Sequence, residues 1–272
     1  DDARNLSPRI RLAFGAGVIG AAILTTGAGL QLADSVFQAF GIALPPMVAQ
    51  TISFFAAIFI VLGACHSTNL IDGLDGLCSG VTAIILFGFF LLAGFLAAWE
   101  YSRDGDPVRL VLAISMFGAA MGFLPFNFPP AQIFMGDAGS TLLGFNCGMM
   151  ILMFAERGVF RWVLGALMIF ALPVFDTALA MFRRWRSGRS IFAGDRSHFY
   201  DQLVQRGMTV PQAVLTSYLV TLLFAGVGLS VIGLRTWYAV AVFAAVVALT
   251  AYLSWVTGLA RVERKSNSPT AH

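Results

Sequence analysis

Long apolar runs separated by short polar segments dominate the chain. An α-helix needs about 20 consecutive apolar residues to cross the hydrocarbon core of a membrane. We count eight such runs. The predicted spans cover residues 8–30, 47–64, 80–99, 108–124, 140–154, 161–182, 213–233 and 237–259. The pattern therefore predicts an all-α fold, a polytopic membrane protein with about eight transmembrane helices.

The composition excludes several other classes of protein. Hydrophobic residues make up 58% of the 272 positions and charged residues only 11%, whereas soluble domains carry about 25% charged residues. Disordered chains are polar, so the same numbers exclude disorder. The net charge of +3 and the lack of a long basic tract outside the membrane flanks argue against nucleic-acid binding. The three cysteines show no CxxC spacing and are expected to be buried apolar residues.

The chain is expected to form one integral membrane domain over residues 1–272, ending in a polar tail at 260–272 that we place in the cytoplasm. It begins Asp1-Asp2, without an initiator Met and without the features of a signal peptide. We interpret this start as a truncation.

The distribution of basic residues predicts the orientation in the membrane. An even number of spans places both ends on one side, and cytoplasmic loops carry the excess of Lys and Arg. Twelve of the 17 Lys and Arg lie in segments on the side of the ends, and five lie on the other side. We therefore expect the side of both ends to be cytoplasmic. Most of the acidic residues on this side lie near the ends of the predicted helices. Burial of a carboxylate at a membrane boundary costs free energy, so such residues often mark a functional site.

The segment 66–79 holds Asn69 and two Asp-Gly pairs, Asp72-Gly73 and Asp75-Gly76. Glycine lets the backbone approach a ligand closely and adopt a positive φ. One Asp-Gly pair is typical of a simple polar turn. Two pairs after an asparagine, in an apolar frame, favour a functional loop.

The segment 125–141 places Asp137 between two glycines just before a predicted span. The N-terminus of a helix favours anions, so a carboxylate there needs a cation nearby. Mg²⁺ beside phosphate oxygens meets that need. The alternative is that Asp137 caps the helix, and the residues alone leave both open.

The segment 183–212 is rich in arginine. We expect Arg183, Arg184 and Arg186 to be ordinary flanking charges. Arg196 and His198 lie well beyond the end of the span and could hold a diphosphate. Asp176 follows Pro173 within the predicted span 161–182, where a carboxylate is a functional candidate and a structural hydrogen bond is the equal alternative.

Together these segments resemble the polyprenyl-phosphate N-acetylhexosamine-1-phosphate transferase family over nearly the whole chain. The matching segments, in order, are Asp1-Asp2, an NxxDGxDGL loop from Asn69, a PAxxFMGDxGS loop from Pro130, Pro173-Val-Phe-Asp176 and Asp195-Arg-Ser-His198. Members usually have about three more spans before the aspartate pair, so about three upstream helices are expected to be missing. The family's HxHH cluster is reduced here to His198-Phe199-Tyr200-Asp201, which argues against its peptidoglycan branch.

The resemblance implies transfer of a sugar 1-phosphate, most simply GlcNAc-1-phosphate, from a UDP-sugar to undecaprenyl phosphate with release of UMP. This step would start an envelope glycan such as O-antigen, teichoic acid or capsule. It also implies Mg²⁺, with Mn²⁺ as an alternative, an inner-membrane location and a cytoplasmic active site. A homodimer is left open.

The resemblance also implies a role for each matching residue. Asp137 and Asn69 would hold the metal, and Asp75 and Phe134 would bind uracil. Asp1, Asp2, Asp72, Arg196 and His198 form the catalytic set, and Gly73 and Asp176 join the substrate-binding set. The alternative from another class is a transporter with Asp176 as an ion or proton relay. Transporters bind their substrates near the midplane of the membrane, whereas the acidic residues of these motifs lie in loops. A non-catalytic scaffold would not account for the two aspartate loops.

Overall fold

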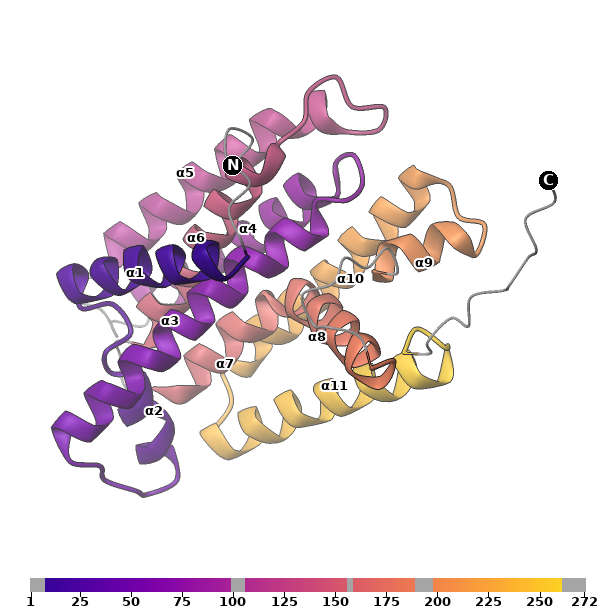
Figure 1. Ribbon diagram of the computed structural model, residues 1–272. Coiled ribbons are helices and arrows are strands. Elements are labelled where there is room, and N and C mark those ends of the chain that lie inside the picture. Colours follow the sequence, from indigo (N-terminus) through magenta and orange to yellow (C-terminus); the bar gives the residue numbers. More distant parts are fainter. Residues whose placement is uncertain (1–7, 99–105, 156–158, 189–197, 261–272) are drawn as a thin grey trace, which may run out of the picture.

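A computed structural model describes residues 8–98, 106–155, 159–188 and 198–260 (Figure 1). Within these residues all regular structure is helical, which confirms the predicted all-α class. The helices are α1 (Pro8–Thr26), α2 (Leu32–Ala39), α3 (Pro46–Ile71), α4 (Leu77–Ala98), α5 (Asp106–Asn127), α6 (Gly136–Ala155), α7 (Phe160–Ile169), α8 (Ala171–Arg186), α9 (Phe199–Gln205), α10 (Val210–Val231) and α11 (Thr236–Val256).

The helices make a multi-pass membrane protein, but the expected eight continuous spans need correction. Within the described residues, six helices are long and apolar enough to cross a membrane, namely α3, α4, α5, α6, α10 and α11. A bent pair of helices brings the number to seven. Helix α1 is shorter than predicted because Gly27 follows it with a φ of 75°, a left-handed conformation that ends helices.

The predicted span 161–182 is wrong as a single helix. It consists of α7 and α8, which meet at Phe170 and are bent by 73° relative to each other. Pro173 explains the break. Its ring clashes with the carbonyl four residues earlier, which belongs to Ile169, the last residue of α7. Helix α8 therefore leaves the line of α7 and carries Asp176 towards α9.

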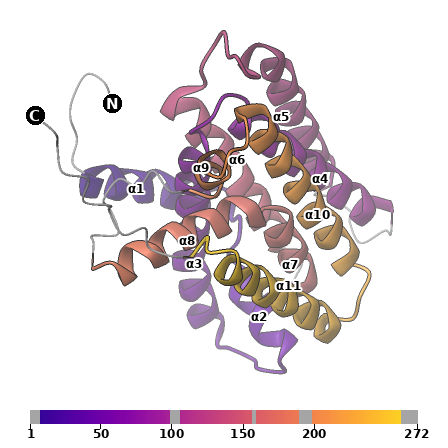
Figure 2. The ribbon, with the colours of Figure 1, turned by 90° about the vertical axis from the view of Figure 1, so that its right-hand side faces the viewer.

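The helices pack closely where glycines allow their backbones to approach. A Cβ on Gly144 of α6 would lie 2.6 Å from the Ala64 carbonyl oxygen of α3, and one on Gly148 would lie 2.9 Å from the Cα of Val61. Figure 2 shows α10 beside α4 and α7, in agreement with their contacts. The core between these helices includes the fully buried Phe89. Cys65, Cys78 and Cys147 are free and buried, as expected.

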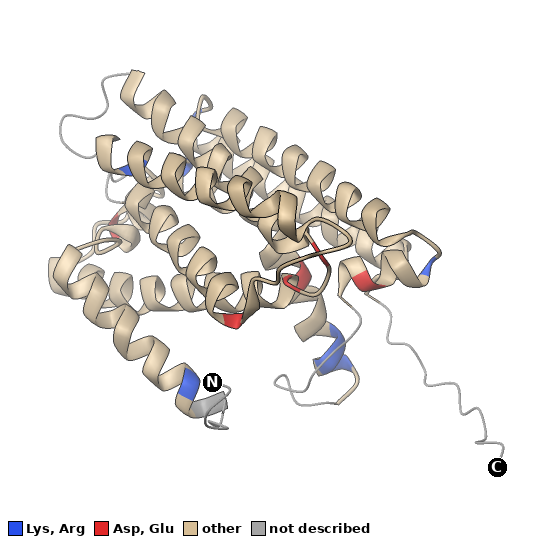
Figure 3. Cartoon of the chain, turned by 90° about the horizontal axis from the view of Figure 1, so that it is seen from above, with Lys and Arg blue, Asp and Glu red and all other residues tan. Residues whose placement is uncertain are grey.

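Most of the acidic residues that the structure describes gather at one end of the bundle (Figure 3). There α3 ends near Asp72, α4 follows Asp75, and α6 begins beside Asp137. We call this the aspartate end. Helix α9 also lies there, whereas α2 lies at the opposite end (Figure 1). Both short helices fall in stretches that the sequence pattern assigned to loops.

Candidate functional site

The turn between α3 and α4 carries the first aspartate motif. Helix α3 ends at Ile71, and the Asp72 amide donates to the Asn69 carbonyl at 3.2 Å. The Gly73 amide donates to the Ile71 carbonyl at 2.8 Å, and Gly76 has a φ of 75°. Asn69 thus occupies the last turn of the helix, and Asp72 lies just beyond it. The residues after Ile71 form a tight turn, which we call the 72–76 turn.

The second aspartate motif forms the start of α6. Gly136 begins the helix with a φ of 67°, and Asp137 lies in its first turn. This agrees with the expectation that the segment enters a helix. The Asn69 side-chain amide donates to Asp137 Oδ1 at 3.2 Å and to Ser140 Oγ at 3.0 Å. The two motifs, far apart in the sequence, therefore touch through side chains.

The carboxyl group of Asp72 lies within electrostatic range of Asp137. Burial, with a smaller contribution from the negative charge of Asp137, raises the pKa of Asp72 to about 6. A cation near both groups would oppose this effect, because an opposite charge favours the ionised carboxylate.

Asp72 and Asp137 supply too few ligands for a metal site that is built from protein side chains alone. Among the described residues, no group of three or more His, Cys, Asp or Glu side chains could hold a metal ion. Mg²⁺ at a phosphate site needs only one or two carboxylates, because phosphate oxygens and water complete its shell. The donors at Asp137, with Asn69 and Asp72 close by, therefore fit a magnesium ion that arrives with a diphosphate.

A buried asparagine joins the 72–76 turn to the loop 128–135. Asn127 accepts hydrogen bonds from the Gly76 amide at 3.1 Å and from Ser79 Oγ at 2.7 Å, and it donates to the Ile133 carbonyl at 3.0 Å. Asp75 accepts from the Ala131 amide at 3.0 Å. Sequence reasoning treated Asn127 as a loop residue. The sequence does contain a sign of this role, because Asn127 is a lone side-chain amide in the apolar stretch around Phe126 and Phe128. A buried amide requires hydrogen-bond partners.

Phe134 lies near the end of that loop and is 76% exposed. Its ring is therefore largely uncovered by the described part of the chain and available for stacking. Asp75, predicted as its partner in binding uracil, already uses one carboxylate oxygen to hold the loop.

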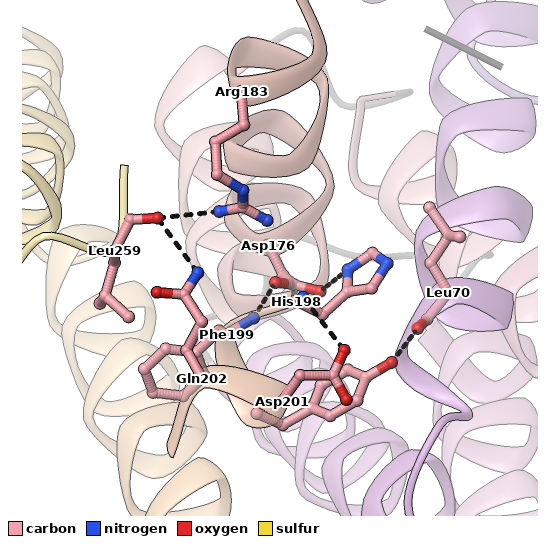
Figure 4. Close-up of polar contacts among 9 residues, drawn as sticks. Leu70, Asp176, Arg183, His198, Phe199, Asp201, Gln202 and Leu259 are labelled. Carbon is pink, nitrogen blue, oxygen red and sulfur yellow. Dashed lines mark hydrogen bonds and ion pairs between the residues drawn. The ribbon is translucent and has the colours of Figure 1, made fainter. Parts of the chain in front are cut away.

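Asp176 and His198 form a buried pair at the start of α9 (Figure 4). Asp176 Oδ2 lies 2.7 Å from His198 Nδ1, and Asp176 Oδ1 accepts from the Phe199 amide at 2.6 Å. The His198 amide donates to Asp201 Oδ2 at 3.1 Å. Both oxygens of Asp176 thus position the histidine and its helix. Helix α9 was missed, because His198 is not one of the usual N-cap residues, although Asp201 at the third helical position accepts from the His198 amide as in a capping box.

Two tyrosines that sequence reasoning missed hold the end of α3 and the 72–76 turn that follows it. The Tyr200 hydroxyl donates to the Leu70 carbonyl at 2.9 Å, and the Tyr218 hydroxyl donates to the Gly76 carbonyl. A Cβ on Gly73 would lie 2.2 Å from the Tyr200 hydroxyl. Gly73, predicted to bind substrate, is therefore the residue that admits the tyrosine. Burial raises the pKa of Tyr200 well above its usual range, and nearby acids such as Asp201 add to the rise.

The arginines at the end of α8 differ from ordinary flanking charges. Arg183 and Arg184 are buried, and Arg183 donates to the Leu259 carbonyl at 3.0 Å. The Arg186 guanidinium lies 5.0 Å from the centre of the Trp255 ring. These contacts attach α8 to the end of α11.

Three predicted site residues lie outside the described part of the chain. They are Asp1, Asp2 and Arg196. Their roles stay predictions.

Comparisons with known proteins point to one family. Residues 1–155 match the family model described as "Glycosyl transferase family 4". A "Probable undecaprenyl-phosphate N-acetylglucosaminyl 1-phosphate transferase" of Bacillus subtilis (strain 168) is 27% identical over 95% of this chain and 69% of its own length. An "Undecaprenyl-phosphate alpha-N-acetylglucosaminyl 1-phosphate transferase" of Yersinia pestis is 33% identical over 86% of this chain and 62% of its own.

A third relative comes from another bacterial group. The "Decaprenyl-phosphate N-acetylglucosaminephosphotransferase" of Mycobacterium leprae (strain TN) is 31% identical over 72% of this chain and 55% of its own length. The chain thus spans between about half and about two thirds of the length of these relatives.

Proposed function

Because the chain belongs to glycosyl transferase family 4, we propose that it transfers GlcNAc-1-phosphate from a UDP-sugar to a polyprenyl phosphate and releases UMP. The family and the printed activities of the relatives support this kind of reaction. The observation that carries the proposal is the contact between Asn69 and Asp137, which joins the two aspartate motifs at one end of the bundle.

The reaction is a phosphoryl transfer between two phosphates. An oxygen of the polyprenyl phosphate attacks the sugar-bearing phosphorus, and a new P–O bond forms. The bond between that phosphorus and the oxygen that bridges the two phosphates breaks, and UMP leaves with the bridging oxygen and the electron pair. Such reactions need positioning and neutralisation of charge more than covalent help from the protein. A phosphate monoester is mostly a dianion at neutral pH, since its second pKa is about 6, so the acceptor needs no strong base.

Each residue at the aspartate end has a task in this proposal. Asp137, with Asn69 and Asp72, would hold Mg²⁺ or Mn²⁺, which when bound neutralises the diphosphate. Asn69 orients the Asp137 carboxylate through its amide. The exposed Phe134 ring would stack on uracil. Asp75 would position the loop 128–135, which carries Phe134. His198, held by Asp176, would contact the diphosphate or sugar.

The proposed location is a bacterial inner membrane, with the aspartate end facing the cytoplasm. The concentration of Lys and Arg in the segments on that side supports this orientation. A cytoplasmic site would face the soluble UDP-sugar, while the membrane supplies the lipid acceptor.

The first test is an assay of the protein expressed from its complete gene and purified in detergent. Undecaprenyl phosphate, Mg²⁺ and one UDP-sugar at a time are supplied, and UMP release is measured. UMP that appears only with lipid phosphate and UDP-GlcNAc supports the proposal. No release with any UDP-N-acetylhexosamine from a folded, monodisperse protein contradicts it.

The variant Asp137→Asn tests the assigned carboxylate. It keeps the shape of the side chain but removes its charge, so we expect kcat to fall about 100-fold or more. Asp34→Asn is the matched control, because Asp34 lies in α2 at the opposite end of the bundle. Its kcat should equal that of the wild type. Full activity of Asp137→Asn would overturn the metal assignment.

A further inference from the structure

The last carbonyl groups of α3 lack partners within the helix and must find them elsewhere. The Asn69 carbonyl accepts from the Asp72 amide, and the Ile71 carbonyl accepts from the Gly73 amide. Between them, the Leu70 carbonyl accepts from Tyr200 of α9, 130 residues away in the sequence. A side chain of another helix thus completes the end of the helix that presents Asn69.

Tyr200 also fits the 72–76 turn by shape. A Cβ on Gly73 would lie 2.2 Å from the hydroxyl oxygen of Tyr200 and 2.7 Å from its Cζ. No larger residue at position 73 leaves room for this ring. The glycine of the motif and the tyrosine of α9 are therefore complementary.

The ring of Tyr200 also stacks on the histidine of the site. The rings of Tyr200 and His198 are stacked, with 5.5 Å between their centres and 5° between their planes. Asp176 holds the same histidine through Nδ1 (Figure 4). One aromatic ring is therefore close to both Gly73 of the 72–76 turn and His198.

We propose that Tyr200 is a positioning residue that fixes the position of the 72–76 turn relative to His198. Asn69 and Asp72 then face the same substrate as the histidine. This inference rests on the proposed transferase function. It assigns Tyr200 no contact with substrate.

The test compares Tyr200→Phe with the matched variant Tyr218→Phe in the protein expressed from its complete gene. Both changes remove a phenol hydroxyl that donates to a backbone carbonyl: Tyr200 to that of Leu70 at the end of α3, and Tyr218 to that of Gly76 in the turn. The Gly76 carbonyl, the acceptor for Tyr218, also accepts from the Gly80 amide and Ser79 Oγ. Tyr218→Phe therefore leaves its acceptor satisfied, whereas Tyr200→Phe removes the donor that reaches Leu70 in the described contacts.

We expect Tyr200→Phe to lower kcat about tenfold, with the KM for polyprenyl phosphate and the melting temperature close to wild type. Tyr218→Phe should keep most of its kcat. Equal kcat in Tyr200→Phe and wild type would overturn the proposal. So would a loss of kcat that only follows a loss of folded protein.

Hydrogen exchange separates this inference from the function on which it rests. Amides of the 72–76 turn should exchange faster in Tyr200→Phe than in Tyr218→Phe, whether or not the protein proves to be a transferase. Unchanged exchange there overturns the positioning role, while absence of UMP release from the wild type overturns the proposed function alone.

A double-mutant cycle gives a second measurement of the same contact. Gly73→Ala should disrupt the turn when Tyr200 is present, because the added Cβ meets its ring. In a Tyr200→Ala background the same change should increase exchange at the turn much less. Additive effects of the two changes would show that the residues do not act through one another.

Discussion

At the residue scale, single polar side chains at the aspartate end hold neighbouring helices in place through buried hydrogen bonds. Asp176 is 2% exposed and His198 is 3% exposed, and the carboxylate satisfies both the imidazole and the Phe199 amide. Sequence reasoning left a structural hydrogen bond and a functional role as equal alternatives for Asp176. The geometry shows that its oxygens hold α9, and its effect on chemistry would pass through the histidine.

Asp176→Ala should therefore destabilise the junction of α8 and α9. It leaves the His198 ring and the Phe199 amide without their acceptor, and an unsatisfied buried group costs about 1–3 kcal/mol. The unfolding free energy in mixed detergent measures this cost. Asp75→Ala serves as a comparison, because Asp75 is only half-buried and accepts one backbone hydrogen bond. An equal or smaller loss for Asp176→Ala would contradict the structural role.

At the scale of elements, the site depends on how closely helices approach each other. The contact between Asn69 and Asp137 exists because α3 and α6 lie side by side along Gly144 and Gly148. Glycines suit close helix contacts in lipid, and Gly144 and Gly148 allow the close approach of α6 to α3. Pro173 can kink a helix, and the structure shows a bend of 73° between α7 and α8 there.

Gly144→Ala should push α6 away from α3, because its Cβ would lie 2.6 Å from a backbone oxygen. Overpacking of this kind costs about 1–3 kcal/mol, and it should also lower kcat by separating Asn69 from Asp137. Gly118→Ala in α5 is the matched control, since a Cβ there meets nothing within 4 Å. The control should change the unfolding free energy by less than about 1 kcal/mol. Similar behaviour of the two variants would contradict the close-packing argument.

At the scale of the whole molecule, the ends of the bundle differ in chemistry. One end carries Asp72, Asp75 and Asp137 with α9, and the other carries α2 (Figure 1). The three native cysteines are buried, so introduced cysteines can report on each end with little background.

Gln38→Cys and Gln132→Cys form a matched pair for testing orientation. Both glutamines are exposed, one in α2 and the other in the loop 128–135. If the aspartate end is cytoplasmic, an impermeant maleimide should label Gln38→Cys in intact spheroplasts. Gln132→Cys should react only after permeabilisation. The reverse pattern would place the aspartate end outside and refute the proposed orientation.

The sequence by itself determined the features that depend on local pattern. The apolar runs specified a polytopic helical protein, because each run is long enough to satisfy its own backbone hydrogen bonds in lipid. The aspartate motifs established the family resemblance and indicated which residues belong to the site. Asn69 and Asp137 were recognised as partners only through that resemblance.

The tertiary structure decided which of these residues meet and what holds them. The link between Tyr200 and Leu70 joins residues 130 positions apart, and Asn127 reaches across 51 residues to the Gly76 amide. The break at Phe170 places Asp176 beside His198. No local pattern contains these contacts, because hydrophobic periodicity shows which face of a helix is apolar but not which neighbour that face will meet.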